Sequence, residues 1–314
     1  MKLFKKFLKI NGYGLIIFAV LVGIVAVYNT IALKSEADRI IPNGEMVDLG
    51  DYKVHVYSEG DESKELTLVF LSGSGTVAPV YDFKVLYSLL TDEYRTAVVE
   101  KVGYGYSDIV VVERDINSVL SELRSALTKA GIQGPYILIP HSMSGLEALY
   151  WAQKYPDEVK GIIGIDMAVP DSYDDFDFKQ IDRMKFLGKL STKLGLTRIP
   201  GLYPLSKLSL TDKETEQQVL LMHRNALNPV FISEGEYIFE NAQTVKQGGE
   251  IFCPILLFAS DGSEVGDSWV SSLKKFAEET DADLIAYDSG HYLHHSKSNE
   301  MAMAIKEFLL EMGY

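Results

Sequence analysis

Residues 136–146 read Tyr136-Ile137-Leu138-Ile139-Pro140-His141-Ser142-Met143-Ser144-Gly145-Leu146. The first five residues form an apolar run typical of a buried strand, and a helical pattern begins after the serine. A tight turn between a strand and a helix exposes the serine hydroxyl at the end of the strand, beside the free N–H groups of the helix N-terminus. Ser142 is therefore a candidate nucleophile, although an ordinary helix N-cap would also place a serine here.

This stretch resembles the nucleophile elbow of the α/β-hydrolase superfamily, which reads Gly-x-Ser-x-Gly. Pro140 and Ser144 stand where that motif has its two glycines. Ser144 adds a Cβ and a hydroxyl at a crowded position, and Pro140 lacks an N–H at the end of the strand. The resemblance extends over residues 46–312. It implies an α/β-hydrolase fold with a mostly parallel eight-stranded sheet, helices on both faces and a helical cap.

Apolar runs that predict strands alternate with helical patterns along most of the chain. Gly50-Asp51 is a two-residue hairpin signal between the first two predicted strands, at 46–49 and 52–57. Further strands are predicted at 66–71, 96–100, 136–140, 161–165, 254–259 and 284–287, and helices at 115–130 and 299–312. This alternation predicts a parallel, doubly wound sheet.

The alternation of strands and helices stops between the predicted strands at 161–165 and 254–259. Residues 171–250 have a helical pattern, with helices expected near 176–194, 212–226 and 229–244. In the family that the chain resembles, a cap inserted at this point covers the nucleophile and selects the substrate. We therefore expect a core formed by residues 46–170 and 251–314 and a helical cap formed by residues 171–250.

The N-terminal part of the chain predicts a membrane segment. Residues 10–33 carry no charge and are long enough to cross a bilayer. Four lysines precede them, at Lys2, Lys5, Lys6 and Lys9, which places residues 1–9 in the cytoplasm as a basic tail and the remaining chain outside. We expect a signal anchor at 10–33 and a tether at 34–45. The alternative is a cleaved signal peptide and a secreted protein.

Charge and cysteine content exclude several classes. The formal net charge is -14, and because residues 1–33 contribute +4, the rest of the chain carries -14 - 4 = -18. Nucleic acid is therefore excluded as a natural partner, and the domain as a whole is not expected to adhere to anionic lipid. Cys253 is the only cysteine, so no intrachain disulfide can form. The sequence also contains no Asn-x-Ser/Thr sequon, and together with the missing disulfide this favours a bacterial cell-surface protein.

A serine nucleophile requires a base, and the base requires a carboxylate that orients it. The resemblance assigns the base to His291, in a Gly-His loop between the last predicted strand and the last predicted helix. It places the acid at Asp261, after the preceding strand. Two alternatives remain open: Glu264 in the same loop, and Asp166, which follows the strand after the nucleophile.

The resemblance also implies an oxyanion hole. Ser72-Gly73-Ser74-Gly75 follows a buried strand, and the family pattern makes the backbone N–H groups of Ser74 and Met143 the donors. His294 and His295 follow His291 closely, and the three together could be interpreted as a metal cluster. No further ligand lies at a spacing that demands a metal, so we expect no metal and no organic cofactor.

These observations together predict a membrane-anchored, extracytoplasmic serine hydrolase that cleaves an ester or related acyl bond of a small-molecule substrate. Two other classes fit the same sequence. One is a non-catalytic binding module that has kept the fold, and the other is an acyltransferase that uses the same serine and excludes water. The sequence names neither the acyl substrate nor an oligomeric state.

Overall fold

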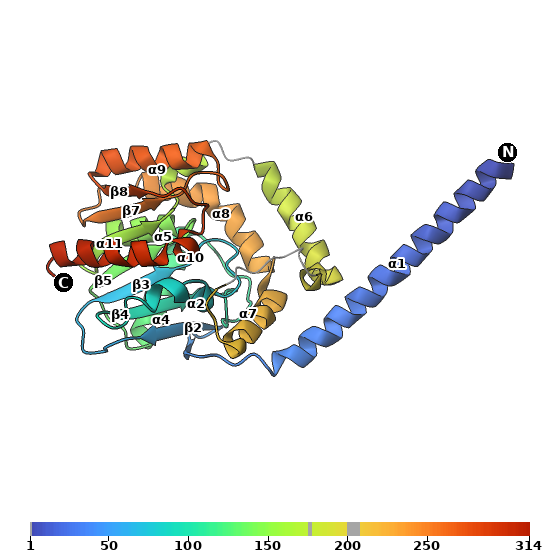
Figure 1. Ribbon diagram of the computed structural model, residues 1–314, viewed down its shortest axis with the longest axis horizontal. Helices are drawn as coiled ribbons and strands as arrows, with labels where there is room; N and C mark the ends of the chain where they lie inside the picture. Colours follow the sequence, from blue (N-terminus) through green and yellow to red (C-terminus); the bar gives the residue numbers. More distant parts are fainter. Residues whose placement is uncertain (1, 175–177, 200–207) are drawn as a thin grey trace.

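An eight-stranded sheet forms the centre of the computed structural model, which describes residues 2–174, 178–199 and 208–314 (Figure 1). The strands are β1 (Glu45–Asp48), β2 (Lys53–Glu59), β3 (Thr67–Leu71), β4 (Arg95–Glu100), β5 (Tyr136–Pro140), β6 (Val159–Ile165), β7 (Ile255–Ala259) and β8 (Asp283–Ala286). Their order in the sheet is β1-β2-β4-β3-β5-β6-β7-β8. The predicted fold class is confirmed.

Only the first strands are antiparallel. β1 pairs with β2, and β2 with β4, in antiparallel register, whereas every pair from β4 to β8 is parallel. The predicted hairpin is correct, and Gly50 at its turn has φ of 105°, which favours glycine. Parallel strands end at the same edge of the sheet, so the loops after β3, β5, β6 and β7 meet there.

Helices cover both faces of the sheet. They are α2 (Pro79–Asp82), α3 (Lys84–Tyr87), α4 (Ile116–Lys129), α5 (Ser144–Lys154), α9 (Asp267–Thr280), α10 (Leu293–Ser296) and α11 (Ser298–Glu311). One hydrophobic cluster lies under α4, α5 and α9, and a second lies under α3 and α11. Asp115 starts α4 as its N-cap, because its side chain accepts the N–H groups of Asn117 and Ser118.

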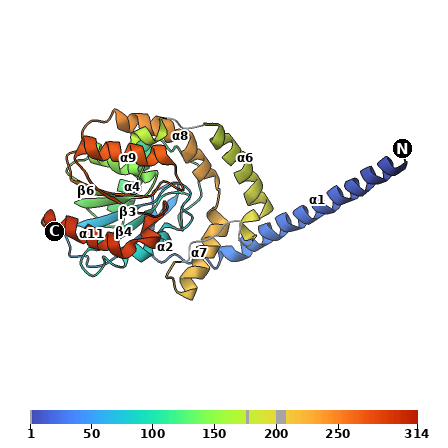
Figure 2. The ribbon, with the colours of Figure 1, turned by 45° about the horizontal axis from the view of Figure 1, so that its top comes forward.

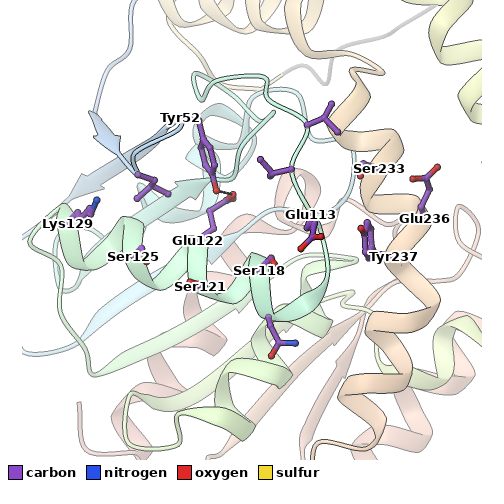
Figure 3. Close-up of a pocket in the computed structure, with 14 residues that line it drawn as sticks. Tyr52, Glu113, Ser118, Ser121, Glu122, Ser125, Lys129, Ser233, Glu236 and Tyr237 are labelled. Carbon is purple, nitrogen blue, oxygen red and sulfur yellow. Dashed lines mark hydrogen bonds between the residues drawn. The ribbon is translucent and has the colours of Figure 1, made fainter.

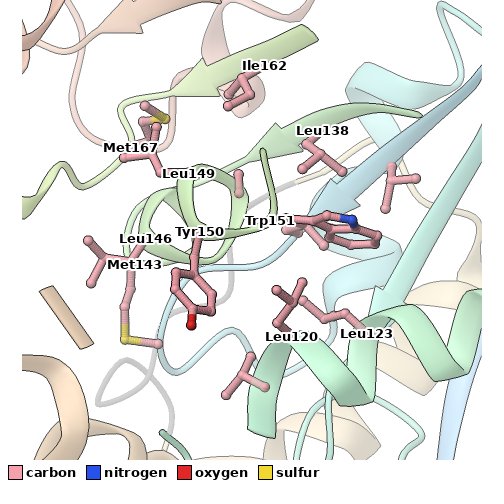
Figure 4. Close-up of a cluster of buried hydrophobic side chains, with 14 of the residues drawn as sticks. Leu120, Leu123, Leu138, Met143, Leu146, Leu149, Tyr150, Trp151, Ile162 and Met167 are labelled. Atoms are coloured by element: carbon pink, nitrogen blue, oxygen red, sulfur yellow. The ribbon is translucent and has the colours of Figure 1, made fainter. Parts of the chain in front are cut away.

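Side chains of the central strands alternate between these two clusters. On β3, Val69 and Leu71 belong to the first cluster, and Leu68 and Phe70 to the second. Figure 4 shows the first cluster, in which Leu138 of β5 lies among residues of α4 and α5. A strand that is buried on both faces is a continuous apolar run, which explains why these strands were predicted from the sequence.

Between β6 and β7 the chain forms η1 (Pro170–Tyr173), α6 (Phe178–Leu194), η2 (Leu196–Arg198), α7 (Asp212–Asn225) and α8 (Pro229–Lys246). We call α6, α7 and α8 the cap helices; within the described residues they agree closely with the three helices expected here, and the expected start of the first, at 176–177, lies outside those residues. The side-chain amides of Asn225 and Asn228 attach the cap to the core loop after β4, by donating to the carbonyls of Gly105 at 2.7 Å and Gly103 at 2.8 Å.

Helix α1 (Lys2–Ala37) projects away from the globular part of the molecule (Figures 1 and 2). Among the described residues it is the single helix long and apolar enough to cross a membrane, and a signal sequence would have the same properties. Most of its described apolar side chains are exposed, for example Ile16, Val20 and Ile24. A membrane anchor and a signal sequence therefore both remain compatible with α1.

Candidate active site

Ser142 lies in the turn between β5 and α5 and has φ of 56°, a conformation that costs energy for a residue with a side chain. Backbone hydrogen bonds hold it there. Its carbonyl accepts the N–H of Gly145 at 3.0 Å and of Ala168 at 2.7 Å, and its own N–H donates to Ile165 at 3.3 Å. The turn is therefore fixed from both α5 and the end of β6, which keeps the serine at the edge where the loops meet.

The glycine-rich loop after β3 packs directly against this turn. A Cβ placed on Gly73 would lie 2.6 Å from the Cβ of Ser142 and 3.0 Å from the carbonyl oxygen of His141. No side chain fits at that position without displacing the serine. The neighbouring N–H of Ser74 and that of Met143 have no hydrogen-bond acceptor within the described part of the chain. They are thus free to donate to a bound oxyanion.

Ser144 departs from the glycine of the family motif, and its surroundings explain how the larger residue is accommodated. The side chain is fully buried, and its Oγ accepts the N–H of His141 at 3.0 Å. The same oxygen lies 2.7 Å from the carbonyl of Leu71 and 2.8 Å from that of His141, so its single proton has an acceptor in either direction. The hydroxyl thereby joins the serine turn to the end of β3.

His291 contacts Asp166. The Nδ1 atom of His291 lies 2.6 Å from Oδ2 of Asp166, whose side chain is completely buried. The other carboxylate oxygen accepts the backbone N–H of Ser260 at 3.1 Å. Because Nδ1 donates to the carboxylate, the remaining ring nitrogen, Nε2, is left as the proton acceptor. We call Ser142, His291 and Asp166 the candidate triad.

Asp261, the acid expected from the resemblance, makes a different contact. Asp261 is exposed, and its Oδ1 accepts the N–H of Ser263 at 2.8 Å, so the side chain closes a turn within its own loop. Glu264, the other acid of this loop, accepts the backbone N–H of His291 at 2.7 Å and does not orient the ring. Of the three acids considered, Asp166 is the one whose carboxylate reaches the imidazole.

His141, directly before the serine, was given no role by the sequence. Its ring is buried, and Nε2 lies 3.3 Å from the carbonyl oxygen of His291. The ring centroids of His141 and His291 are 4.6 Å apart. Burial, with the nearby His294 and His291, holds the pKa of His141 well below its usual range. A neutral His141 supports the backbone of the candidate base, His291. The position of His141 directly before Ser142 was the feature of the sequence that could have identified it.

Asp82, at the end of α2, lies between two histidines. Its carboxylate oxygens lie 2.8 Å from Nε2 of His294 and 3.0 Å from Nε2 of His295. Burial raises the pKa of Asp82, but the charge of His294 and the hydrogen bonds of both histidines more than offset this and keep that pKa below its usual value. These three side chains could bind a metal ion, since their donor atoms lie within 4.8 Å of one another. Without a metal ion, the carboxylate of Asp82 is hydrogen-bonded directly to both histidine rings.

A buried network of charges connects the cap to the core beside the serine turn. Glu234 of α8 lies 3.0 Å from the guanidinium of Arg114 and 3.5 Å from Nζ of Lys101, and it accepts a hydrogen bond from Tyr104. Lys101 in turn lies 2.5 Å from Glu147 of α5. All of these side chains are buried, so α8 is fixed to the core by ion pairs that water does not reach.

A large hollow of about 1010 Å³ lies elsewhere, between α4, α8 and the turn after β1 (Figure 3). Most of its lining residues have a polar side chain, among them Tyr52, whose hydroxyl donates to Glu122 at 2.9 Å, together with Lys129 and Tyr237. None of the candidate triad residues lines this hollow. Its size is therefore no guide to what binds at Ser142.

Comparisons with known proteins agree with the fold. A family model described as alpha/beta hydrolase fold matches residues 67–192. An uncharacterized protein of Bacillus subtilis, YbdG, is 43% identical over 223 residues, which cover 69% of this chain and 68% of YbdG. The 2-(acetamidomethylene)succinate hydrolase of Mesorhizobium japonicum is 29% identical over 120 residues, covering 38% and 41% of the two chains. A structure from a study of carboxylesterases of Nitrososphaera gargenis is 18% identical, with a TM-score of 0.64, and covers 84% of this chain and 97% of its own.

Proposed function

We propose that this chain, which belongs to the α/β-hydrolase family, is a serine hydrolase that cleaves an ester or related acyl bond. The observation that carries the proposal is the 2.6 Å contact between His291 Nδ1 and the buried carboxylate of Asp166. Ser142, which has positive φ, donates its N–H to Ile165, the residue directly before Asp166. Family membership supports a hydrolase. Ser142 is then the nucleophile, His291 the base and Asp166 the acid.

The proposed reaction proceeds through an acyl-enzyme. Ser142 Oγ attacks the acyl carbonyl while its proton passes to Nε2 of His291, and Asp166 stabilises the imidazolium that results. The oxyanion accepts the N–H groups of Ser74 and Met143, each worth roughly 10²- to 10³-fold in rate. His291 then returns the proton to the leaving alcohol. Water, deprotonated by the same nitrogen, releases the acyl group.

Labelling with a fluorophosphonate probe tests this assignment. We expect the purified full chain to be labelled, and Ser142→Ala to abolish the labelling. Ser74→Ala is the matched control, because Ser74 is exposed close to the site and the proposal uses only its backbone N–H. Absence of labelling in the folded protein would favour a binding module. Labelling without ester hydrolysis, with turnover restored by added alcohol or amine acceptors, would favour an acyltransferase.

We propose further that α1 anchors the protein in the membrane with the catalytic domain outside the cytoplasm. The uncharged segment at 10–33, preceded by four lysines, supports this orientation. Retention of the full-length chain in membranes washed with alkaline carbonate tests the anchor. A mature protein that begins near Leu33 and appears in the medium would establish a cleaved signal peptide instead.

A further inference from the structure

Helix α6 has a charge opposite to that of the domain that carries it. Five basic residues and one acidic residue lie in its sequence, which gives 5 - 1 = +4, whereas residues 34–314 as a whole carry -18. The expectation that this domain would not adhere to anionic lipid was drawn from its total charge. That argument does not apply to α6, because charge acts on a surface over about 10 Å or less at physiological salt.

The exposed side of α6 carries large apolar side chains between two basic side chains. Phe186 is 69% exposed, Leu187 57% and Leu190 42%. Arg183 and Lys193 are also exposed, and each lies three residues from the nearer end of this apolar group, on the same side of the helix. We call these five residues the outer stripe of α6. Its apolar middle and basic ends are typical of a helix that lies on a membrane surface.

The opposite side of α6 is used for packing. Gly188 is buried, and a Cβ added to it would lie 3.3 Å from side-chain atoms of Leu227 and Ile232, the latter on α8. Ser191 is also buried. The outer stripe therefore faces away from the rest of the cap. No element in the described part of the chain buries its three apolar side chains.

The end of α6 is joined to α1. The amide of Asn29, on α1, donates to the carbonyl of Thr192 at 2.9 Å, and its oxygen accepts from Arg198 at 2.7 Å. Arg198 also makes a two-pronged ion pair with Glu36, with both contacts at 2.7 Å. Asn29 is only 4% exposed. We call these contacts the α1–cap joint.

The α1–cap joint lies at the depth where a membrane would end. Asn29 lies twenty positions after Lys9, and at 1.5 Å per position this spans about 30 Å, the thickness of the hydrocarbon layer. Both views show α6 crossing the direction of α1, on the side of the globular part from which α1 departs (Figures 1 and 2). A helix that crosses the spanning helix at its outer end lies along the plane of the membrane.

We propose that the outer stripe of α6 rests on anionic phospholipid at the outer surface of the membrane, with its apolar side chains among the lipid headgroups. This inference rests on the proposed anchoring by α1. The α1–cap joint sets the height and direction of α6, and the basic residues supply the attraction to anionic headgroups. The cap of the proposed hydrolase is thus held against the membrane by two contacts, α1 and α6.

A fluorescent probe at residue 186 tests the proposal in the full chain reconstituted into vesicles. In a Cys253→Ser background, Phe186→Cys is labelled with an environment-sensitive fluorophore, and the vesicles carry nitroxide lipids as quenchers. Phe252→Cys is the matched control, because Phe252 is 80% exposed and precedes β7, at the edge of the sheet opposite the cap. We expect strong quenching at 186 in phosphatidylglycerol vesicles and little at 252.

Charge should control the contact. Arg183→Gln together with Lys193→Gln should lower the ratio of docked to undocked α6 by about fivefold per charge removed. Equal, weak quenching at 186 and 252 in protein that floats with the vesicles would overturn the inference and leave the anchor intact. Failure to float would overturn both, while fluorophosphonate labelling reports separately on the hydrolase. Shielding of residue 186 that rises with protein concentration and not with lipid would show that a second copy covers the stripe, and would also overturn the inference.

Discussion

Replacing Asp166 by asparagine changes one atom of a buried carboxylate and should nearly abolish turnover. In the native protein one carboxylate oxygen faces His291 Nδ1 at 2.6 Å and the other accepts the N–H of Ser260 at 3.1 Å. An asparagine has one oxygen for these two partners. If its oxygen stays on Ser260, its NH₂ faces His291, which must then carry its proton on Nε2 and cannot accept the proton of Ser142.

The magnitude follows from the alternative orientation. Turning the amide over restores an acceptor for His291 but places NH₂ against the N–H of Ser260, in a site that is closed to water. An unsatisfied buried donor costs about 1–3 kcal/mol, so this orientation is roughly 5- to 150-fold less populated. Loss of the negative charge weakens the imidazolium further. We expect turnover to fall by about 10³- to 10⁴-fold, or roughly 4–5.5 kcal/mol in the barrier.

The assay is hydrolysis of an activated ester by purified variants, with thermal unfolding measured on the same samples. Asp261→Asn is the control, because the exposed Asp261 side chain accepts the N–H of Ser263 within its own loop and an amide oxygen can do the same. We expect its turnover to stay within about twofold of the native value. Folded Asp166→Asn with activity within tenfold of native, or a large loss in Asp261→Asn, would refute the assignment.

Two further predictions concern packing and pH. Gly73→Ala should slow probe labelling of Ser142 and lower the free energy of unfolding by about 1–3 kcal/mol, because the new Cβ would lie 2.6 Å from that of the serine. Ser74→Ala, in the same loop and at an exposed position, should leave labelling nearly unchanged, and equal labelling rates in both variants would contradict this. Burial holds the pKa of His141 and of His294 below the ordinary value, so the unfolded chain binds protons that the folded chain does not once the pH falls below about 6.5. Denaturant unfolding should show stability falling by up to about 1.4 kcal/mol per pH unit for each histidine below that pH, and an unaltered slope in His141→Gln would count against the assignment for His141.

Much of the fold was predictable because strands that are buried on both faces leave continuous apolar runs in the sequence. The runs at Leu68 and Leu138 are of this kind, and Asp115 marks the start of α4 as an N-cap. The contact between Asn29 and Thr192 was not predictable, because it joins residues 163 positions apart through one hydrogen bond. Periodicity reports which side of a helix is apolar and does not identify its neighbour.

The site was predictable to the level of loops. Asp166 and Asp261 follow adjacent parallel strands, β6 and β7, and so lie at the same edge of the sheet. The choice between them depends on the direction of each side chain. Asp261 lies two residues before an N–H that it can accept locally, whereas Asp166 directly follows β6 with φ of 40°, and its side chain is buried against His291. Strand order gives no information about either difference.

The ion pairs of Glu234 limit how the cap can move. Lifting α8 would leave Glu234, Arg114 and Lys101 without part of their compensating charge, and separating a buried pair costs about 3–5 kcal/mol. An open state of that energy is populated by roughly 1 molecule in 10² to 10⁴. Helix α8 therefore keeps its position against the core in nearly all molecules. Substrate and product of the proposed hydrolase would therefore enter and leave without displacing α8.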